Sequence, residues 1–148
     1  MNTESSARKR LDIMPKENLA INWRRIPERY RLEGSCCEKC NTNYFPTRKL
    51  CPVCRRKGKI MPKRFSGNGK IYSFTEITVG PPGFELETPY VLAIIELEEG
   101  PKLTAQVVGV GERDVKIGDS VEVVFRRITE DNSEGLIHYG YKFRLLKN

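Results

Sequence analysis

The chain of 148 residues is long enough for one ordinary domain or two small ones. It is 39% hydrophobic and 30% charged, with a mean hydropathy of −0.50, which is typical of a globular protein in water. The longest apolar run, residues 90–95, is far shorter than the roughly 20 residues that a membrane-spanning helix needs. Residues 1–18 are polar and partly basic, so we expect no Sec-type secretion, no membrane segment and a cytoplasmic location.

The net charge of +7 is distributed unevenly along the chain. Residues 1–64 contain 17 Lys and Arg against 6 Asp and Glu, a net charge of +11, whereas residues 65–148 contain 9 against 13, a net charge of −4. Such asymmetry is typical of two modules that meet different partners.

The first part of the chain predicts a tail followed by a short arm. Residues 1–17 are expected to be a disordered tail, and residues 18–33 an N-terminal helical arm. Within this arm, residues 18–25 favour a short helix that carries Trp23. Pro27 predicts that a regular helix kinks, restarts or ends there, because proline lacks the N–H group and its ring clashes with the preceding turn.

The arm is expected to lead into a cysteine-rich segment. Residues 29–34 predict a strand with Tyr30 and Leu32 on one face. Residues 34–58 contain all the cysteines and many turn-forming residues, and residues 59–64 are expected to lead onward in an extended conformation, because Pro62 disfavours helix.

Residues 65–148 show the two-residue periodicity of strands and predict a five-stranded barrel. A short connector without strand character is expected between the third and fourth strands, at residues 111–118, and a hairpin turn at residues 131–135. This order is that of an OB-fold; an SH3-like barrel also has five strands but usually lacks a connector at that place. The five expected strands are residues 70–79, 90–98, 102–110, 120–129 and 136–146.

The cysteines form two CxxC pairs, Cys37 with Cys40 and Cys51 with Cys54, separated by ten residues. Each pair lets two thiolates converge on one ion from a tight turn, and two pairs supply the four soft ligands that tetrahedral zinc prefers. Because four protein ligands leave no open position, the zinc is expected to be structural. The competing interpretation, two redox-active pairs, lacks the βαβ setting of a thioredoxin-like motif.

Other residues of possible chemical interest have simpler explanations. Cys36 could replace Cys37 as a ligand, but its spacing to Cys40 is one residue too long for the usual turn. His138 is the only histidine and is expected to have a structural role. No histidine lies beside a serine or cysteine, and no phosphate-binding motif is present, so we expect no catalysis. The glutamates at residues 96, 98 and 99 favour a solvated turn over an acid–base pair.

Several motifs together resemble a known family. They are WRRIPERYRLEG at residues 23–34, the two CxxC pairs with Tyr44-Phe45-Pro46-x-Arg48 between them, and GKIYSFT at residues 69–75. The chain resembles the thiolase-associated, or acyl-CoA-associated, zinc-ribbon/OB-fold family of unknown function, and most of all its archaeal branch. The resemblance covers roughly residues 18–148. It implies a mainly β fold: an N-terminal helical segment, a rubredoxin-like zinc ribbon at residues 34–64 and a C-terminal OB barrel at residues 65–148.

The resemblance also implies a role. Archaeal members join acetoacetyl-CoA thiolase and hydroxymethylglutaryl-CoA synthase at the entry to the mevalonate pathway, so we expect a non-catalytic scaffold, with contact to CoA or acyl-CoA also allowed. The arm and the ribbon are expected to supply at least one contact to a partner enzyme. The candidate partner-binding residues of the arm are Trp23, Arg24, Arg25, Ile26, Arg29 and Tyr30. The competing interpretation is that these aromatic side chains cover the protein's own core.

A second class of function is binding of single-stranded nucleic acid. Zinc ribbons and OB-folds both serve this purpose with stacking aromatics over a basic groove. The ribbon carries enough positive charge to bind a nucleic acid, but the barrel is acidic. The first long loop of the barrel carries Glu85 and Glu87 where the nucleic-acid strand would be expected to pass. We therefore expect nucleic acid not to be the partner, and an unrecognised enzyme is the least favoured interpretation.

Overall fold

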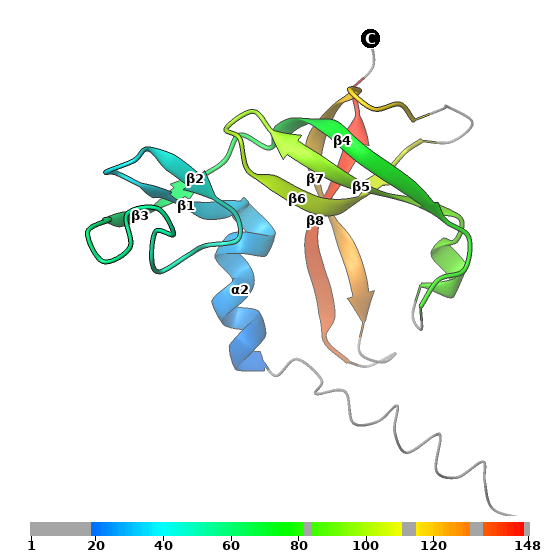
Figure 1. Ribbon diagram of the computed structural model, residues 1–148. Helices are drawn as coiled ribbons and strands as arrows, with labels where there is room; N and C mark the ends of the chain where they lie inside the picture. Colours follow the sequence, from blue (N-terminus) through cyan, green and yellow to red (C-terminus); the bar gives the residue numbers. More distant parts are fainter. Residues whose placement is uncertain (1–18, 82–83, 111–114, 131–134, 147–148) are drawn as a thin grey trace, which may run out of the picture.

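The computed structural model describes residues 19–81, 84–110, 115–130 and 135–146. One helix, α2 (Leu19–Arg31), precedes a three-stranded sheet and then a closed barrel, so the prediction of a mainly β fold is confirmed (Figure 1). The expected tail, most of the expected hairpin turn and the first half of the expected connector lie outside the described residues. No helix among the described residues has the length and apolar character that crossing a bilayer demands.

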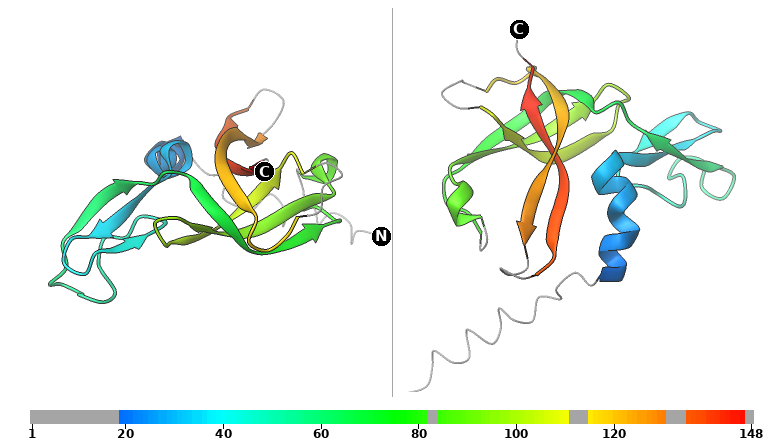
Figure 2. Two further views of the ribbon diagram at one scale, coloured as in Figure 1. Left: turned by 90° about the horizontal axis from the view of Figure 1, so that it is seen from above. Right: turned by 180° about the vertical axis from the view of Figure 1, so that it is seen from behind.

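The small sheet is built around strand β1 (Glu33–Cys37). Strands β2 (Thr42–Tyr44) and β3 (Ile60–Arg64) pair antiparallel with its two edges. The loops that carry the cysteines extend from this sheet on the side away from the barrel (Figures 1 and 2).

Helix α2 continues through Pro27 to Arg31, so the prediction that the helix covers only residues 18–25 is wrong. Two contacts support the helix around the hydrogen bond that proline cannot make. The Arg29 Nη1 atom donates to Asn22 Oδ1 at 3.0 Å, which bridges the turn that contains Pro27. The ring of Tyr30 packs on Phe125 of the barrel with 4.8 Å between centroids, and this contact fixes the C-terminal turn.

The strand expected at residues 29–34 is also wrong for most of its length. The helix runs to Arg31, and only at Glu33 does extended backbone begin. Leu32 separates the two elements with a φ of 49°, in the left-handed region that commonly ends a helix. Its side chain is buried, so the energy of burial offsets the cost of this backbone conformation for a leucine.

The barrel consists of five strands in the closed order β4-β5-β6-β8-β7. A short parallel pairing of Val107 with Phe143, between β6 and β8, closes it. Each observed strand starts and ends within two residues of its prediction, and the strand order is that of the predicted OB-fold. The strands are β4 (Asn68–Ile77), β5 (Tyr90–Leu97), β6 (Lys102–Val108), β7 (Ser120–Glu130) and β8 (Ile137–Leu145).

One hydrophobic core joins the barrel to the ribbon. Phe65, which follows β3, and Leu32, which follows α2, are both buried in the same cluster as the barrel side chains. The Phe65 backbone N–H donates to the Leu32 carbonyl at 3.2 Å. The barrel contributes Ile71, Ala93, Ile95, Leu97, Leu103, Ala105, Val107, Val121 and Phe143 to this cluster.

Gly34 lies where this shared core meets the ribbon. A Cβ atom at this position would approach the Tyr44 carbonyl oxygen to 2.3 Å and a ring carbon of Phe65 to 2.5 Å. The first neighbour is backbone of a paired strand and cannot turn aside, so the sheet itself would have to shift.

Gly34→Ala is therefore expected to lower the free energy of unfolding by about 1–3 kcal/mol, because overpacking strains the junction. Gly140→Ala is the matched control, since its nearest neighbour is a side-chain atom of Ile128 at 3.2 Å and not backbone. Urea unfolding of both variants checks the prediction. An equal loss of unfolding free energy in the two variants would show that the packing at Gly34 is no more restrictive than the packing at Gly140.

The loop between β4 and β5 is tied to the barrel by one charged side chain. This loop contains the short helix η1 (Glu85–Glu87), and Glu87 accepts hydrogen bonds from Lys142 Nζ and Gln106 Nε2, both at 3.0 Å. Lys142 is buried, and Glu87 is its counter-ion. Partial burial alone would raise the pKa of Glu87, but the hydrogen bonds from Gln106 and Lys142 and the charge of Lys142 lower it overall.

A carboxyl group with a lowered pKa stabilises the fold above its ordinary pKa, and this contribution disappears as pH falls through the folded-state value. Glu87→Gln is therefore expected to lower the free energy of unfolding at neutral pH, with a difference from the unmodified protein that shrinks in acid. Urea titrations at neutral pH and below the ordinary carboxyl pKa measure this difference. The control is Glu76→Gln, an exposed position on β4; a pH-independent effect of Glu87→Gln would exclude the ionic tie.

Candidate functional site

Both CxxC segments fold into the same turn. The N–H of Asn41 donates to the Cys37 carbonyl at 2.7 Å, and the N–H of Arg55 donates to the Cys51 carbonyl at 2.8 Å. Asn41 and Arg55 follow the second cysteine of each pair, and both adopt left-handed backbone conformations, with φ of 53° and 49°. The repeated turn points the two pairs of thiols toward one another.

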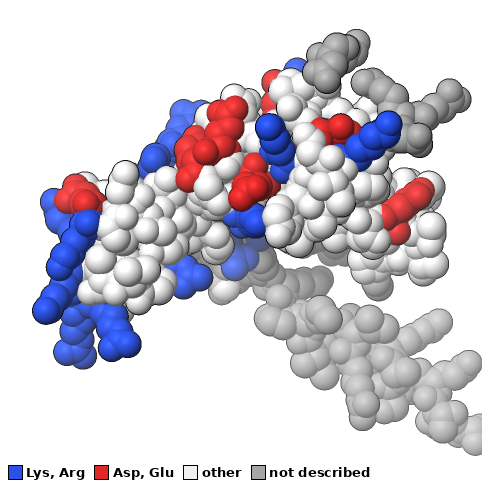
Figure 3. All heavy atoms as spheres, turned by 45° about the horizontal axis from the view of Figure 1, so that its top comes forward, with Lys and Arg blue, Asp and Glu red and all other residues white. Residues whose placement is uncertain are grey.

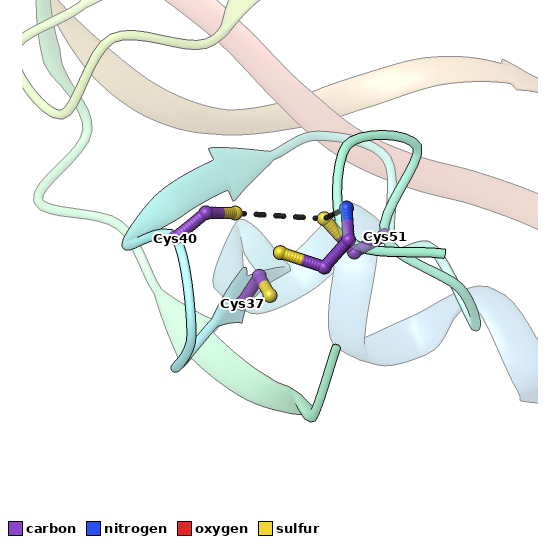
Figure 4. A group of neighbouring side chains, drawn as sticks. Cys37, Cys40 and Cys51 are labelled. Atoms are coloured by element: carbon purple, nitrogen blue, oxygen red, sulfur yellow. Dashed lines mark hydrogen bonds between the residues drawn. The ribbon is translucent and has the colours of Figure 1, made fainter. Parts of the chain in front are cut away.

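The four sulfur atoms of Cys37, Cys40, Cys51 and Cys54 all lie within 4.8 Å of one another. Figure 4 shows the Cys37, Cys40 and Cys51 side chains converging, and the sulfurs of Cys40 and Cys51 are 3.5 Å apart. A tetrahedral zinc ion with Zn–S bonds of about 2.3 Å requires sulfur–sulfur distances a little under about 4 Å. The cluster therefore has the size, the ligand type and the ligand number of a structural zinc centre.

The electrostatics of the cluster also fit a cation. The Cys54 backbone N–H and the Tyr44 hydroxyl each lie 3.3 Å from the Cys51 sulfur and lower the pKa of that thiol to about 6. The same contact raises the pKa of Tyr44 to about 12. Burial raises the pKa of Cys54 to about 12. The neighbouring thiols therefore do not all ionise readily together. A divalent cation removes this obstacle, because its charge stabilises every thiolate that binds it.

The segment between the two pairs supports the cluster from outside. Tyr44 contacts a cysteine through its hydroxyl, and the guanidinium carbon of Arg48 lies 5.6 Å from the centroid of its ring. Phe45 turns the other way and packs on Phe65 and Tyr141, with 6.2 Å and 5.7 Å between centroids. The Tyr44-Phe45 pair therefore connects the metal centre to the shared core.

Gly58 was not singled out from the sequence, yet the centre depends on it. A Cβ atom there would lie 2.9 Å from Cys51 Cβ, 3.0 Å from Cys54 Cβ and 3.1 Å from Cys37 Sγ. The only sequence signal is a glycine four residues after the last cysteine, which is too common to mark a site.

Two residues left open by the sequence lie apart from the cluster. Cys36 is half-buried, and its sulfur is 3.8 Å from Asn41 Oδ1. His138 lies on β8, where it lines a cleft of about 570 Å³ between β5, β6, β8 and Arg29 of the helix. Among the described residues, the four-cysteine group is the only one with the geometry of a metal centre.

The same cleft bears on nucleic-acid binding, because it occupies the face with which OB-folds hold single strands. Phe84, Tyr90 and Tyr139 line it, but its buried cation, Lys142, is already paired with Glu87. A phosphate would have to displace that carboxylate, which opposes binding of a polyanion.

The candidate partner residues of the arm divide into two groups. Trp23, Arg24 and Arg25 are exposed, with 73% of the Trp23 side chain open to solvent. Ile26 and Arg29 are half-buried, and Tyr30, although 45% exposed, packs on the barrel. The N-terminal half of the helix thus presents apolar and basic side chains outward, whereas its C-terminal half attaches the helix to the protein.

The chain matches two family models. Residues 24–59 match the rubredoxin-like zinc ribbon domain of ChsH2, and residues 63–126 match the C-terminal OB-fold domain of ChsH2. These matches, together with the four convergent thiols, identify a zinc ribbon suited to one structural zinc ion.

Comparison with known proteins finds relatives across most of the chain. A DUF35 domain-containing scaffold protein of Methanocaldococcus jannaschii is 51% identical over 127 residues, which is 86% of this chain and 90% of the relative. The benzoylsuccinyl-CoA thiolase subunit BbsA of Geobacter metallireducens is 34% identical over 115 residues, 76% of this chain and 73% of that subunit. The solved structure of an Ltp2-ChsH2(DUF35) aldolase superposes with a TM-score of 0.65 at 28% identity, covering 88% of this chain and 98% of that one.

Cys37→Ser is expected to reduce the bound zinc well below one ion per chain and to unfold the ribbon, because structural zinc supplies on the order of 10 kcal/mol of folding free energy in small modules. Cys36→Ser is the matched control and should keep both zinc and stability. Metal analysis and thermal unfolding of the two variants test this. A full zinc content in Cys37→Ser would overturn the ligand assignment. A chelator should unfold the ribbon before the barrel, as hydrogen exchange would show.

Proposed function

Because this chain belongs to the ChsH2, or DUF35, family of zinc-ribbon and OB-fold proteins, we propose that it is a non-catalytic scaffold that bridges acetoacetyl-CoA thiolase and hydroxymethylglutaryl-CoA synthase. The relative with 51% identity is itself called a scaffold protein, and more distant relatives are named as parts of a thiolase and an aldolase. Bridging these two enzymes would place the chain in the mevalonate pathway. Its cluster of unbridged thiols suits a reducing compartment such as the cytoplasm.

Helix α2 gives the main support for a partner contact. None of its residues is buried, and Leu19 and Trp23 are 72% and 73% exposed. An isolated protein gains nothing from such exposure, whereas an exposed tryptophan next to two arginines is typical of the centre of a protein interface. Trp23, Arg24 and Arg25 form the proposed contact, and Ile26, Arg29 and Tyr30 hold the helix in place behind it.

A scaffold of this kind would act through proximity. Holding two active sites close raises the effective concentration of an intermediate that one enzyme releases and the next consumes. The thiolase condensation is unfavourable by itself, so rapid use of its product by the synthase would draw it forward. The chain would contribute no nucleophile or base, in agreement with its lack of catalytic motifs.

Trp23→Ala combined with Arg25→Ala is expected to abolish co-purification of the tagged chain with the enzyme bound at the arm. Zinc content and the melting transition should stay nearly unchanged, because Trp23 is exposed. Pull-down from a mixture of the two purified enzymes measures the effect. The control is Val79→Ala with Lys70→Ala, which removes one exposed apolar and one exposed basic side chain from the barrel.

Co-purification that survives the double change in the arm would remove the arm from the interface. A tight, strongly salt-dependent complex with single-stranded DNA, with no enzyme captured, would favour the nucleic-acid alternative instead.

A further inference from the structure

The loops of the zinc ribbon carry the most concentrated positive charge of the described chain. Residues 38–59 contain seven Lys and Arg and a single acid, Glu38. Figure 3 shows these basic side chains gathered at the end of the molecule farthest from the barrel. We define the knuckle tips as Lys39, Arg48, Lys49, Leu50, Val53, Arg55, Arg56, Lys57 and Lys59.

Most of this charge is uncompensated within the described residues. Lys59 pairs with Glu38 at 2.9 Å, and Arg48 lies over the Tyr44 ring. The other five cations of the knuckle tips form no ion pair with any described residue. Neighbouring positive charges repel one another. An acidic partner surface would attract all of them and so offset this repulsion.

Two apolar side chains stand among these charges. Leu50 is 64% exposed and Val53 is 71% exposed, and each sits beside or between cysteines of the second pair. Val53 lies inside the turn that the bound cysteines fix, and Leu50 directly precedes its first cysteine, so both side chains stand on or next to rigid backbone. Little conformational entropy would be lost when they enter a partner's recess.

The composition of the knuckle tips favours a protein over a nucleic acid. Single strands bind through stacking on exposed aromatic rings, and the exposed apolar groups here are aliphatic. The aromatic residues of residues 38–59 are Tyr44 and Phe45, and both already have contacts within the protein. Tyr44 contacts Cys51 and Arg48. Phe45 packs on Phe65 and Tyr141.

We propose that the knuckle tips are a second docking surface, which binds an acidic patch with an apolar recess on one of the two enzymes. This proposal rests on the proposed scaffold function, because a bridge needs two separate contacts. The knuckle loops and the N-terminal end of α2 point to different sides of the molecule, as two separate contacts require (Figure 1). The contact at the knuckle tips is electrostatic and weakens with salt, whereas the contact centred on Trp23 is more apolar and persists.

The test uses the full zinc-loaded chain and each purified enzyme separately. Arg56→Glu with Lys57→Glu should weaken binding to one enzyme by about tenfold or more at low salt and leave the other affinity unchanged. Leu50→Ser with Val53→Ser should weaken binding to the same enzyme. Lys70→Glu with Lys116→Glu, two exposed barrel cations, is the control for net charge. All variants must first retain one zinc ion per chain.

The outcomes separate the two proposals. If the unmodified chain binds both enzymes and neither variant of the knuckle tips changes an affinity, the second docking surface is wrong while the scaffold stands. If the unmodified chain binds neither enzyme, both proposals fall. Tight binding of single-stranded DNA that the charge reversals abolish, without enzyme binding, would assign the knuckle tips to nucleic acid.

Discussion

The ribbon depends on four sulfur atoms that must be held together although they do not ionise readily side by side. Among the described residues 38–59, the only buried hydrophobic one is Cys51, so this segment has no apolar core of its own. Its stability must come from the metal and from Phe45, which reaches the shared core. The surface that the ribbon offers to a partner, including Leu50 and Val53, therefore depends on zinc for its conformation.

Packing contacts hold the helix and the barrel in a fixed position relative to this ribbon. Leu32 and Phe65 join the end of the helix, the ribbon and the barrel in one hydrophobic cluster. Tyr30 on Phe125 fixes the helix against the barrel. A protein that positions two enzymes needs a fixed geometry between its contacts more than it needs a pocket, and these packing contacts supply it.

The sequence was most informative where the signal is local. Two CxxC pairs reveal a metal centre because the ligands of each pair are three residues apart, and strand alternation reveals the barrel because each strand is half buried. The helix was predicted too short, because its last turn packs on Phe125, a residue far away in the sequence. Gly58 could not be found, since its importance comes from three cysteines around it in space and not from its neighbours in the chain.

The zinc ribbon and the OB-fold match separate family models, which suggests modules that could be exchanged freely between relatives. The packing of Gly34 against Phe65 and the Tyr44 carbonyl indicates otherwise. A ribbon transplanted from a relative would bring a foreign surface to that junction and leave a gap or a clash. Within this family, the two halves are therefore expected to vary together, with matched changes at Leu32, Phe45 and Phe65, and a chimaera should succeed only when the joint is transferred whole.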